Sequence, residues 1–333
     1  MWHCLNEKGV GKEYIRIIQD MYADIRTVVK SAAGKTEPFR VEVGLHQGSA
    51  LSPLLFAIVI DVLTQHVRRR APWNMMYADD VVLLNNTKEE SEAELDDWRD
   101  ALERRGLRLS RSKTEYLCIG DQVGQPTIKL GGEDVPKVSE FKYLGSTLQG
   151  NGGCEQEVRR RIQAGWKSWR EVTGVMCDKR MSANMKGKVF RTVIRPAMMY
   201  GVETLPLTKA QEASLETAQM GMLRWSLGWT RRDKVKNEKI RRMTNVSQMP
   251  VKARESRLRW FGHVKRRQDE YVGKQVLKME VGGKRRRGRP KRRWMDVVND
   301  DMRLVGLEEE DAMDRRLWKC GIQYSNPADC RTS

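Results

Sequence analysis

The sequence has few of the residues that build metal cages or covalent cross-links. It contains only four histidines, and none of its cysteines form a Cys-x-x-Cys pair. The six cysteines are scattered along the chain, at Cys4, Cys118, Cys154, Cys177, Cys320 and Cys330. This pattern argues against a zinc site and against a disulfide framework, and it is typical of reduced thiols inside the cell.

Long hydrophobic runs are also lacking. The longest fully apolar segment, residues 54–60, is far too short to cross a bilayer, and the first residues show no signal-peptide pattern. We therefore expect no membrane partner and a nuclear or cytoplasmic protein that is not secreted.

Negative charge is scarce in the second half of the chain. Residues 1–150 contain 20 Lys and Arg against 22 Asp and Glu, whereas residues 151–333 contain 42 against 22. The net charge of +18 therefore belongs to the second half. A basic region of this size indicates a polyanionic partner, most simply nucleic acid, and a solvated, partly disordered tail is the competing explanation.

With 333 residues, the chain is long enough for two or three domains. Hydrophobic spacing predicts an α+β class for residues 1–150, in which helices alternate with short antiparallel hairpins. Helices are expected at 12–23, from Ser52 to about Arg70 with residues 54–63 as a buried spine, and at 88–105. Hairpins are expected at 25–43 and 74–85, and short strands broken by glycines at 107–119 and 127–148. Later helices are expected at 154–177, 182–199, 208–227, 234–265 and 294–319.

Tryptophans recur in the helical region, at Trp166, Trp169, Trp225, Trp229 and Trp260. Their helical spacing favours a role as anchors of a hydrophobic core. Stacking on bases, as in proteins that bind single strands, is the alternative.

Two adjacent acids, Asp79 and Asp80, interrupt an apolar segment that continues with Val81 and Val82. Neighbouring carboxylates repel each other and are costly to bury, so a hydrophobic run tolerates them only with compensation. A tight exposed turn between two strands would supply it, and so would a divalent cation. An ordinary hairpin with a solvated acidic turn is the simpler interpretation.

Three further segments accompany the acidic turn in a fixed order. Gly44–Phe56 precedes it, Ser110–Glu115 follows it, and Phe141–Gly145 comes last. In this order and spacing the segments resemble the palm of a reverse transcriptase of the non-LTR (LINE-type) retrotransposons. The resemblance is close over residues 1–150 and looser beyond. It implies a partial polymerase palm, an antiparallel sheet with packed helices, at 1–150; a helical thumb and connection region at 151–270; and a basic, partly flexible region with a helix at 271–333.

The resemblance also implies roles for the acids. Asp79 matches the main metal ligand of the family turn and Asp80 matches its neighbour, with Mg²⁺ or Mn²⁺ as the cofactor. The family reaction is RNA-directed DNA synthesis by two-metal phosphoryl transfer, with an RNA template and a DNA primer as partners. Tyr77 would lie near the primer end.

Other matched residues are expected to bind substrates. Gln47 and Gly48 match the loop that packs against the nascent base pair, and Tyr143 and Gly145 match the hairpin that grips the primer backbone. Lys113 matches a lysine that supports or protonates the leaving pyrophosphate; a surface lysine on a strand edge is its alternative.

The chain departs from the family at its start. The upstream metal-binding aspartate, which normally lies a few residues before the stretch that matches Met1–Leu5, has no counterpart. We therefore expect an N-terminally truncated reverse transcriptase that is inactive alone. Two alternatives are a nucleic-acid-binding retroelement remnant without catalysis and a fragment that never accumulates as folded protein.

A dense basic segment occupies residues 284–293, with eight Lys and Arg. Its Arg287-Gly288-Arg289-Pro290 core resembles an AT-hook, which implies binding to the minor groove of A·T-rich DNA. A nuclear-localisation-like run and a solvated linker are the alternatives. The nucleic-acid-binding cations expected here are Arg287, Arg289, Lys291, Arg292 and Arg293.

Overall fold

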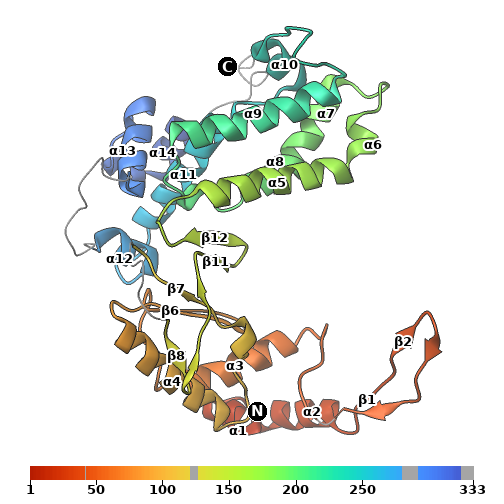
Figure 1. Ribbon diagram of the computed structural model, residues 1–333, viewed down its shortest axis with the longest axis vertical. Helices are drawn as coiled ribbons and strands as arrows, with labels where there is room; N and C mark the ends of the chain where they lie inside the picture. The colour runs from red at the N-terminus through yellow and green to blue at the C-terminus, as the bar shows by residue number, and fades with distance from the viewer. Residues whose placement is uncertain (42, 121–126, 280–291, 324–333) are drawn as a thin grey trace. The chain divides into compact units, whose positions relative to one another are not determined.

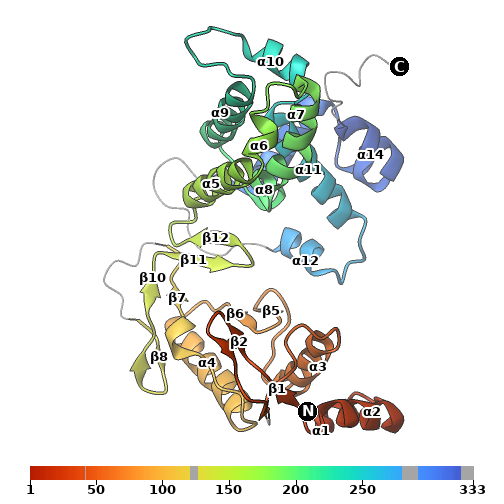
Figure 2. The ribbon, with the colours of Figure 1, turned by 90° about the vertical axis from the view of Figure 1, so that its right-hand side faces the viewer.

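The structure is a computed structural model that describes residues 1–41, 43–120, 127–279 and 292–323. The chain divides into two compact units: unit 1 comprises residues 1–116 and 123–138, and unit 2 comprises residues 117–122 and 139–333. Figures 1 and 2 show helices and short strands in unit 1 and mainly helices in unit 2. The expected mixture of helix and strand followed by a helical region is confirmed at this level. The three-part division at residues 150 and 270 stays a prediction.

Unit 1 alternates helices with short strands. Its helices are α1 (Trp2–Glu7), α2 (Lys12–Tyr22), α3 (Ser52–Thr64) and α4 (Lys88–Glu103), followed by a 3-10 turn at Arg111–Lys113. Its strands are β1 (Arg26–Thr27), β2 (Lys30–Ser31), β3 (Gly34–Lys35), β4 (Phe39–Arg40), β5 (Asn74–Tyr77), β6 (Asp80–Leu83), β8 (Lys129–Leu130), β9 (Glu133–Asp134) and β10 (Lys137–Val138). Strand β7 (Tyr116–Leu117) lies at the border between the units.

The strands pair two by two. β1 pairs with β4, β2 with β3, β5 with β6 and β8 with β9, all antiparallel, and no ladder gains a third strand within the described residues. The hairpin over 25–43 turns at residues 32–33. The sequence indicated a turn near Gly34, which instead is the first residue of β3. The structure thus contains the expected hairpins without a continuous sheet.

Helix α3 is shorter and less buried than expected. It ends at Thr64 and does not reach Arg70. Leu55 is 1% exposed and Leu63 is 8% exposed, but Leu54 is 57% exposed. Only one side of the helix packs into a core, so its nearly continuous apolar sequence did not predict burial all round.

The core of unit 1 consists of several small clusters. One joins Cys4, Leu63, Trp98 and Leu102, and the side chains of Met76, Val81 and Leu83 pack against it. This contact places the β5–β6 hairpin on helices α3 and α4.

Unit 2 begins with the hairpin of β11 (Glu140–Tyr143) and β12 (Ser146–Gln149) and continues with helices. These are α5 (Glu155–Glu171), α6 (Thr173–Met176), α7 (Ala183–Val189), α8 (Arg195–Met199), α9 (Lys209–Ser226), α10 (Asn237–Thr244), α11 (Met249–Lys265), α12 (Val272–Lys278), α13 (Trp294–Val305) and α14 (Arg315–Ile322). A π-helical stretch at Phe190–Ile194 joins α7 to α8, and 3-10 turns cover Val202–Thr204 and Glu310–Met313.

The segment expected as one helix over 234–265 is two helices. Asn245 adopts a left-handed conformation with φ +50° and ends α10, and Pro250 lies in the first turn of α11. Asparagine tolerates the left-handed region and proline is suited to a helix start, so a break between them is physically reasonable.

A large hydrophobic core joins α5, the π-helical stretch, α8, α9 and the start of α11. Trp169, at 4% exposure, is the buried anchor that the sequence predicted, and Trp166 and Trp229 pack partly against this core. Trp225 contradicts the core prediction, because 62% of it is exposed.

No helix within the described ranges combines the length and apolar character that a membrane span requires. Arg287, Arg289 and Lys291 lie outside the residues that the structure describes.

Candidate functional site

The acidic pair lies at the tip of a two-residue hairpin. Strands β5 and β6 pair with Met76 opposite Val81 and Tyr77 opposite Asp80, which leaves Ala78 and Asp79 as the turn. Tyr77, Asp79 and Asp80 are all exposed. The predicted hairpin is confirmed, with Asp79 in the turn and Asp80 as the first residue of β6.

The turn holds an unusual backbone conformation. Ala78 has φ +53°, in the left-handed region, where a residue with a Cβ is disfavoured by about 1–2 kcal/mol. Such conformations persist where the surrounding structure imposes them, and they concentrate at functional sites. Among the described residues, none forms a side-chain hydrogen bond or ion pair with Tyr77, Asp79 or Asp80. Both carboxylates are therefore available to an external cation.

The base of the hairpin, in contrast, is tightly bonded. Asn74 is 6% exposed, and its Nδ2 donates to Glu94 Oε1 at 2.7 Å. Glu94 Oε2 accepts from Asn85 Nδ2 at 2.7 Å and from Arg69 Nη1 at 3.3 Å. The Arg69 guanidinium lies 5.2 Å from the centroid of the Trp73 ring. This network fixes the hairpin to α4.

This network was not predicted from the sequence, although a signal was present. Glu94 lies four residues before Trp98 on α4, so it shares the buried face of the helix, and Asn74 opens an apolar strand. A polar residue on an apolar face needs a partner, and each of these residues is the partner of the other.

The structure supplies two carboxylates for a cation at this turn. No group of three or more His, Cys, Asp or Glu able to hold a metal occurs within the part of the chain that is described. Magnesium is held in many phosphoryl-transfer sites by one or two carboxylates, with water and substrate phosphates completing the shell. Asp79 and Asp80 fit such a shared site but do not form a complete protein cage.

Asp61 on α3 shows how a structural acid differs. Hydrogen bonds from Lys8 and from Arg68, the latter at 2.6 Å, hold the pKa of Asp61 below its usual range. Its charge is therefore balanced within the protein, unlike the charges of Asp79 and Asp80.

The loop with Gln47 and Gly48 is anchored just before α3. Ser52 Oγ donates to the His46 carbonyl at 2.6 Å, and the His46 ring stacks on Tyr22 with centroids 4.6 Å apart. Ser52 is the first residue of α3, as expected. Gln47 and Gly48 are exposed, and Gly48 has φ +86°. An added Cβ at Gly48 would meet no atom within 4 Å, so its surroundings are open.

Lys113 ends the 3-10 turn that follows α4 and is exposed. It is thus a surface lysine, as the alternative held, but it lies on a 3-10 turn and not on a strand edge. The Lys113 ammonium forms no ion pair within the described residues. Unit 1 thus carries Gln47, Asp79 and Lys113 with their functional groups unused, and no bond joins them to one another.

The residues expected to grip a primer form a second hairpin, in unit 2. Tyr143 lies opposite Ser146, and the turn residues Leu144 and Gly145 have φ +48° and +80°. The hydroxyl of Tyr200 donates to the Leu144 carbonyl at 2.8 Å, and Arg161 Nη2 donates to the Gly145 carbonyl.

Arg161 is held by a buried carboxylate. Its guanidinium is paired with Glu157 and lies 4.8 Å from the centroid of the Tyr200 ring. Glu157 is 0% exposed and also accepts the backbone N–H of Thr147 at 2.7 Å. Glu157 and Arg161 are four residues apart on α5, but the groups that they bind, the Gly145 carbonyl, the Thr147 N–H and the Tyr200 ring, come from other segments, so the clamp was not predicted.

Two of the five expected cations in the basic segment are described. Arg292 is paired with Asp300, so part of its charge is used within the protein. Arg293 is exposed, and its backbone N–H donates to Asp296 at 2.8 Å before α13. Binding of the segment to an A·T-rich minor groove stays a prediction.

Comparison with known proteins assigns the class. Residues 2–148 match the family of reverse transcriptases (RNA-dependent DNA polymerases). This segment carries the acidic turn, the Gln47 loop, Lys113 and the β11–β12 hairpin. Residues 2–148 therefore form a reverse transcriptase domain.

Similar proteins place this domain among the retrotransposons of the non-LTR type. The chain is 26% identical over 276 residues to a transposon-derived protein of Caenorhabditis elegans, covering 75% of this chain and 95% of that protein. It is 27% identical over 178 residues to a retrovirus-related Pol polyprotein from the retrotransposable element R2 of Nasonia vitripennis, 46% of this chain and 17% of the polyprotein. It is 30% identical over 149 residues to a 115 kDa protein of the element R1DM of Drosophila melanogaster, 42% of this chain and 14% of that protein. The chain thus spans less than a fifth of these two element-encoded proteins.

Proposed function

We propose that unit 1 is part of a polymerase palm, in which Asp79 and Asp80 hold a divalent cation for RNA-templated DNA synthesis. The observation that carries the proposal is the β5–β6 tip: two unpartnered carboxylates on a strained turn, above a bonded base. A cation bound there would neutralise the phosphates of a nucleotide and of the primer end. Mg²⁺ and Mn²⁺ are the ions that suit this oxygen donor set.

The other exposed residues of unit 1 have roles in the same proposal. Gln47 and Gly48 contact the template and nascent base pair, and the open surroundings of Gly48 leave room for a base. Tyr77 lies at the primer end. Lys113, with an unpaired ammonium, supports the charge of the leaving pyrophosphate. Tyr143 and Gly145 contact the primer backbone from the clamped hairpin.

With two carboxylates at the turn and no larger acidic group among the described residues, this chain by itself should extend primers slowly at most. Ligands from water and substrate hold a cation less firmly than a complete site, and a two-metal mechanism needs both ions. The rate of the isolated chain is therefore expected to be far below that of a complete enzyme.

The direct test is Mn²⁺ binding, followed by electron paramagnetic resonance, in the presence of an RNA template, a DNA primer and a nucleotide. We expect binding by the wild type and its loss in Asp79→Asn/Asp80→Asn. The matched control is Glu89→Gln/Asp97→Asn, which removes two exposed and unpartnered acids of α4. Equal Mn²⁺ binding by wild type and the Asp79→Asn/Asp80→Asn variant would overturn the site.

Primer extension on an RNA template completes the test. Rapid extension that disappears in Asp79→Asn/Asp80→Asn would confirm the site and contradict the expected slow rate. Binding of template and primer without any extension would favour the second candidate, a nucleic-acid-binding protein without catalysis. The basic charge of residues 151–333 is the observation that supports this candidate.

A further inference from the structure

Unit 2 contains a cavity of about 760 Å³ between the end of α9 and the loop that leads to α10. Two tryptophans, Trp225 and Trp229, line it together with the cations Arg224, Arg231 and Lys234. None of these residues belongs to the reverse transcriptase segment 2–148. The combination of aromatic rings and cations calls for a ligand that is both planar and anionic.

Trp225 forms a fixed aromatic platform. It is 62% exposed, yet its ring is supported from within by Trp169 and Trp166, with centroids 5.4 Å and 6.2 Å away. Trp169 in turn is 4% exposed and belongs to the main core. An exposed ring that is held in place this way loses little freedom when a planar group stacks on it.

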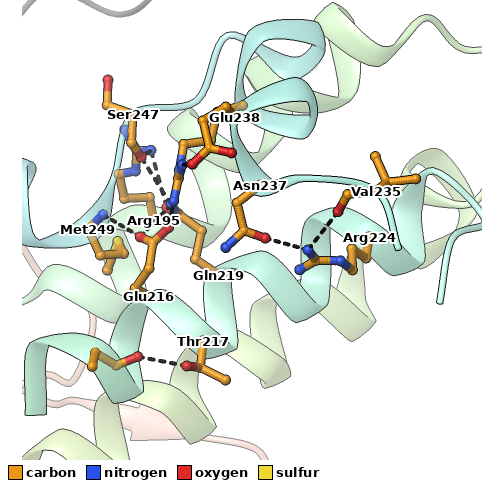
Figure 3. Close-up of polar contacts among 12 residues, drawn as sticks. Arg195, Glu216, Thr217, Gln219, Arg224, Val235, Asn237, Glu238, Ser247 and Met249 are labelled. Atoms are coloured by element: carbon orange, nitrogen blue, oxygen red, sulfur yellow. Dashed lines mark hydrogen bonds and ion pairs between the residues drawn. The ribbon is translucent and has the colours of Figure 1, made fainter. Parts of the chain in front are cut away.

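The wall opposite α9 is held by specific hydrogen bonds. Arg224 Nη2 donates to the carbonyl of Val235 at 3.1 Å and also to the side chain of Asn237 (Figure 3). The backbone N–H and the hydroxyl of Thr230 donate to Asp233 Oδ2 at 2.6 Å and 2.8 Å. These bonds keep the pKa of Asp233 below its usual range and fold the loop into a defined turn. The cavity is therefore formed before any ligand binds.

The electrostatic balance of the cavity is positive. Arg231 and Lys234 are exposed, and neither forms an ion pair with a described residue. The acid in the wall, Glu216, is already engaged by Arg241 at 2.8 Å and by the backbone N–H of Met249 at 2.7 Å, as Figure 3 shows for Met249. The unpaired cations thus remain for an anionic ligand.

We propose that this cavity binds single-stranded nucleic acid, with one base stacked on Trp225 and neighbouring phosphates at Arg231 and Lys234. Every base has a π-face and every nucleotide a phosphate, so binding should depend little on sequence and strongly on salt. The inference extends the proposed function, because the cavity shares no residue with the Asp79–Asp80 turn and would hold a strand by means of unit 2.

The test is fluorescence anisotropy of labelled oligouridine and oligothymidine with the full chain over a range of salt concentrations. Trp225→Ala should weaken binding by about tenfold, the size of one lost stacking contact, and Trp225→Phe should restore most of it. Arg231→Gln/Lys234→Gln should reduce the slope of log affinity against log salt by about 1.4.

Matched controls distinguish binding at this cavity from the general effect of losing an exposed aromatic ring or two exposed cations. Tyr14→Ala removes another exposed aromatic ring, on α2. Lys209→Gln/Lys319→Gln removes two exposed cations of unit 2 that lie outside the cavity. Both controls should retain affinity within about twofold, as for surface changes in general. Anisotropy is measured without a divalent cation, so failure of the palm proposal leaves this test intact.

Several outcomes would overturn the inference. Unchanged affinity in Trp225→Ala, with an unchanged circular dichroism spectrum, would exclude stacking on this ring. If a nucleoside triphosphate binds as tightly as an oligonucleotide, the ligand of the cavity is a free nucleotide and not a strand. A preference for duplex over single strands would exclude stacking of an unpaired base on Trp225. If Trp225→Ala does not fold, an unchanged salt slope in Arg231→Gln/Lys234→Gln decides against the proposal.

Discussion

The hairpins β5–β6 and β11–β12 are alike in the lengths of their strands and turns, and they differ in how the polar groups of their turns are bonded. Each has four-residue strands and a two-residue turn; Ala78 alone is left-handed in the first turn, and both Leu144 and Gly145 have positive φ in the second. At Leu144-Gly145 both turn carbonyls are bonded, to Tyr200 and Arg161, and Arg161 is fixed by the buried Glu157. At Ala78-Asp79 the tip carries two carboxylates without a partner among the described residues, and the bonds lie at the base of the hairpin.

The difference separates two uses of the same motif. A turn whose polar groups are satisfied internally is rigid and presents its shape, which suits contact with a polymer backbone. A turn with unpartnered charges on a fixed base is suited to binding a ligand, because its charged groups gain partners only when the ligand binds. Substitutions at either hairpin should therefore alter one side of this contrast.

The largest effect is expected from Arg161→Met. The change leaves Glu157 as a buried, unpaired carboxylate and frees the Gly145 carbonyl, which should cost about 3–5 kcal/mol in the free energy of unfolding. Urea unfolding followed by tryptophan fluorescence measures it. The control is the neighbouring Arg160→Met, which breaks an exposed pair with Glu140 and should cost at most about 1 kcal/mol. Equal losses in the two variants would mean that the clamp is not buried.

Glu94→Ala should produce the next largest loss, at the base of the other hairpin. It removes the Glu94 acceptor from the buried amide of Asn74, whose Nδ2 keeps only the Trp73 carbonyl at 3.0 Å, and it removes a partner from Asn85 and Arg69, at a cost of about 2–3 kcal/mol. Asp97→Ala, on the exposed face of the same helix, is the control and should change stability by about 0.5 kcal/mol or less. Hydrogen exchange should show faster exchange of the β5–β6 amides in Glu94→Ala only; uniform protection would contradict the anchoring role.

Exchanging alanine and glycine at the two turns should give changes of opposite sign. Ala78→Gly relieves a left-handed conformation worth about 1–2 kcal/mol but adds chain entropy worth about 0.4–1 kcal/mol, so a net gain of about 0.5–1 kcal/mol is expected. Gly145→Ala should lose a similar amount, because Gly145 has φ +80°. Thermal unfolding of both variants measures the difference. A destabilised Ala78→Gly would show that Ala78 is not strained in solution.

These two hairpins also show which features of the fold could be predicted from the sequence. The strand period was correct in both hairpins, and the turn at Ala78-Asp79 lies one residue before the expected Asp79-Asp80 turn. All of these features are determined within a few residues. The acidic turn was also predicted, since adjacent acids in an apolar run require an exposed tip.

What the sequence did not reveal depends on distant partners. Asn74 meets Glu94 across 20 positions, and Arg161 meets the Gly145 carbonyl across 16. The exposure of Trp225 follows from the packing of α5 against α9, which helical spacing alone cannot place. The break at Asn245 was missed for a different reason: its signals, Asn245 and Pro250, were present but weaker than the surrounding helical period.

The smallest effect on stability is expected from Asp79→Asn/Asp80→Asn, and its size decides whether the β5–β6 tip is free. Neither carboxylate has a described partner, so neutralising both should change the free energy of unfolding by no more than about 0.5 kcal/mol, with a slight gain from relieved repulsion. Glu157→Gln, which neutralises a buried and paired carboxylate, should be clearly destabilising in the same urea titration. A loss above about 1 kcal/mol in the Asp79→Asn/Asp80→Asn variant would show that these acids stabilise the fold. The contrast between a clamped turn and a chemically available turn would then fail.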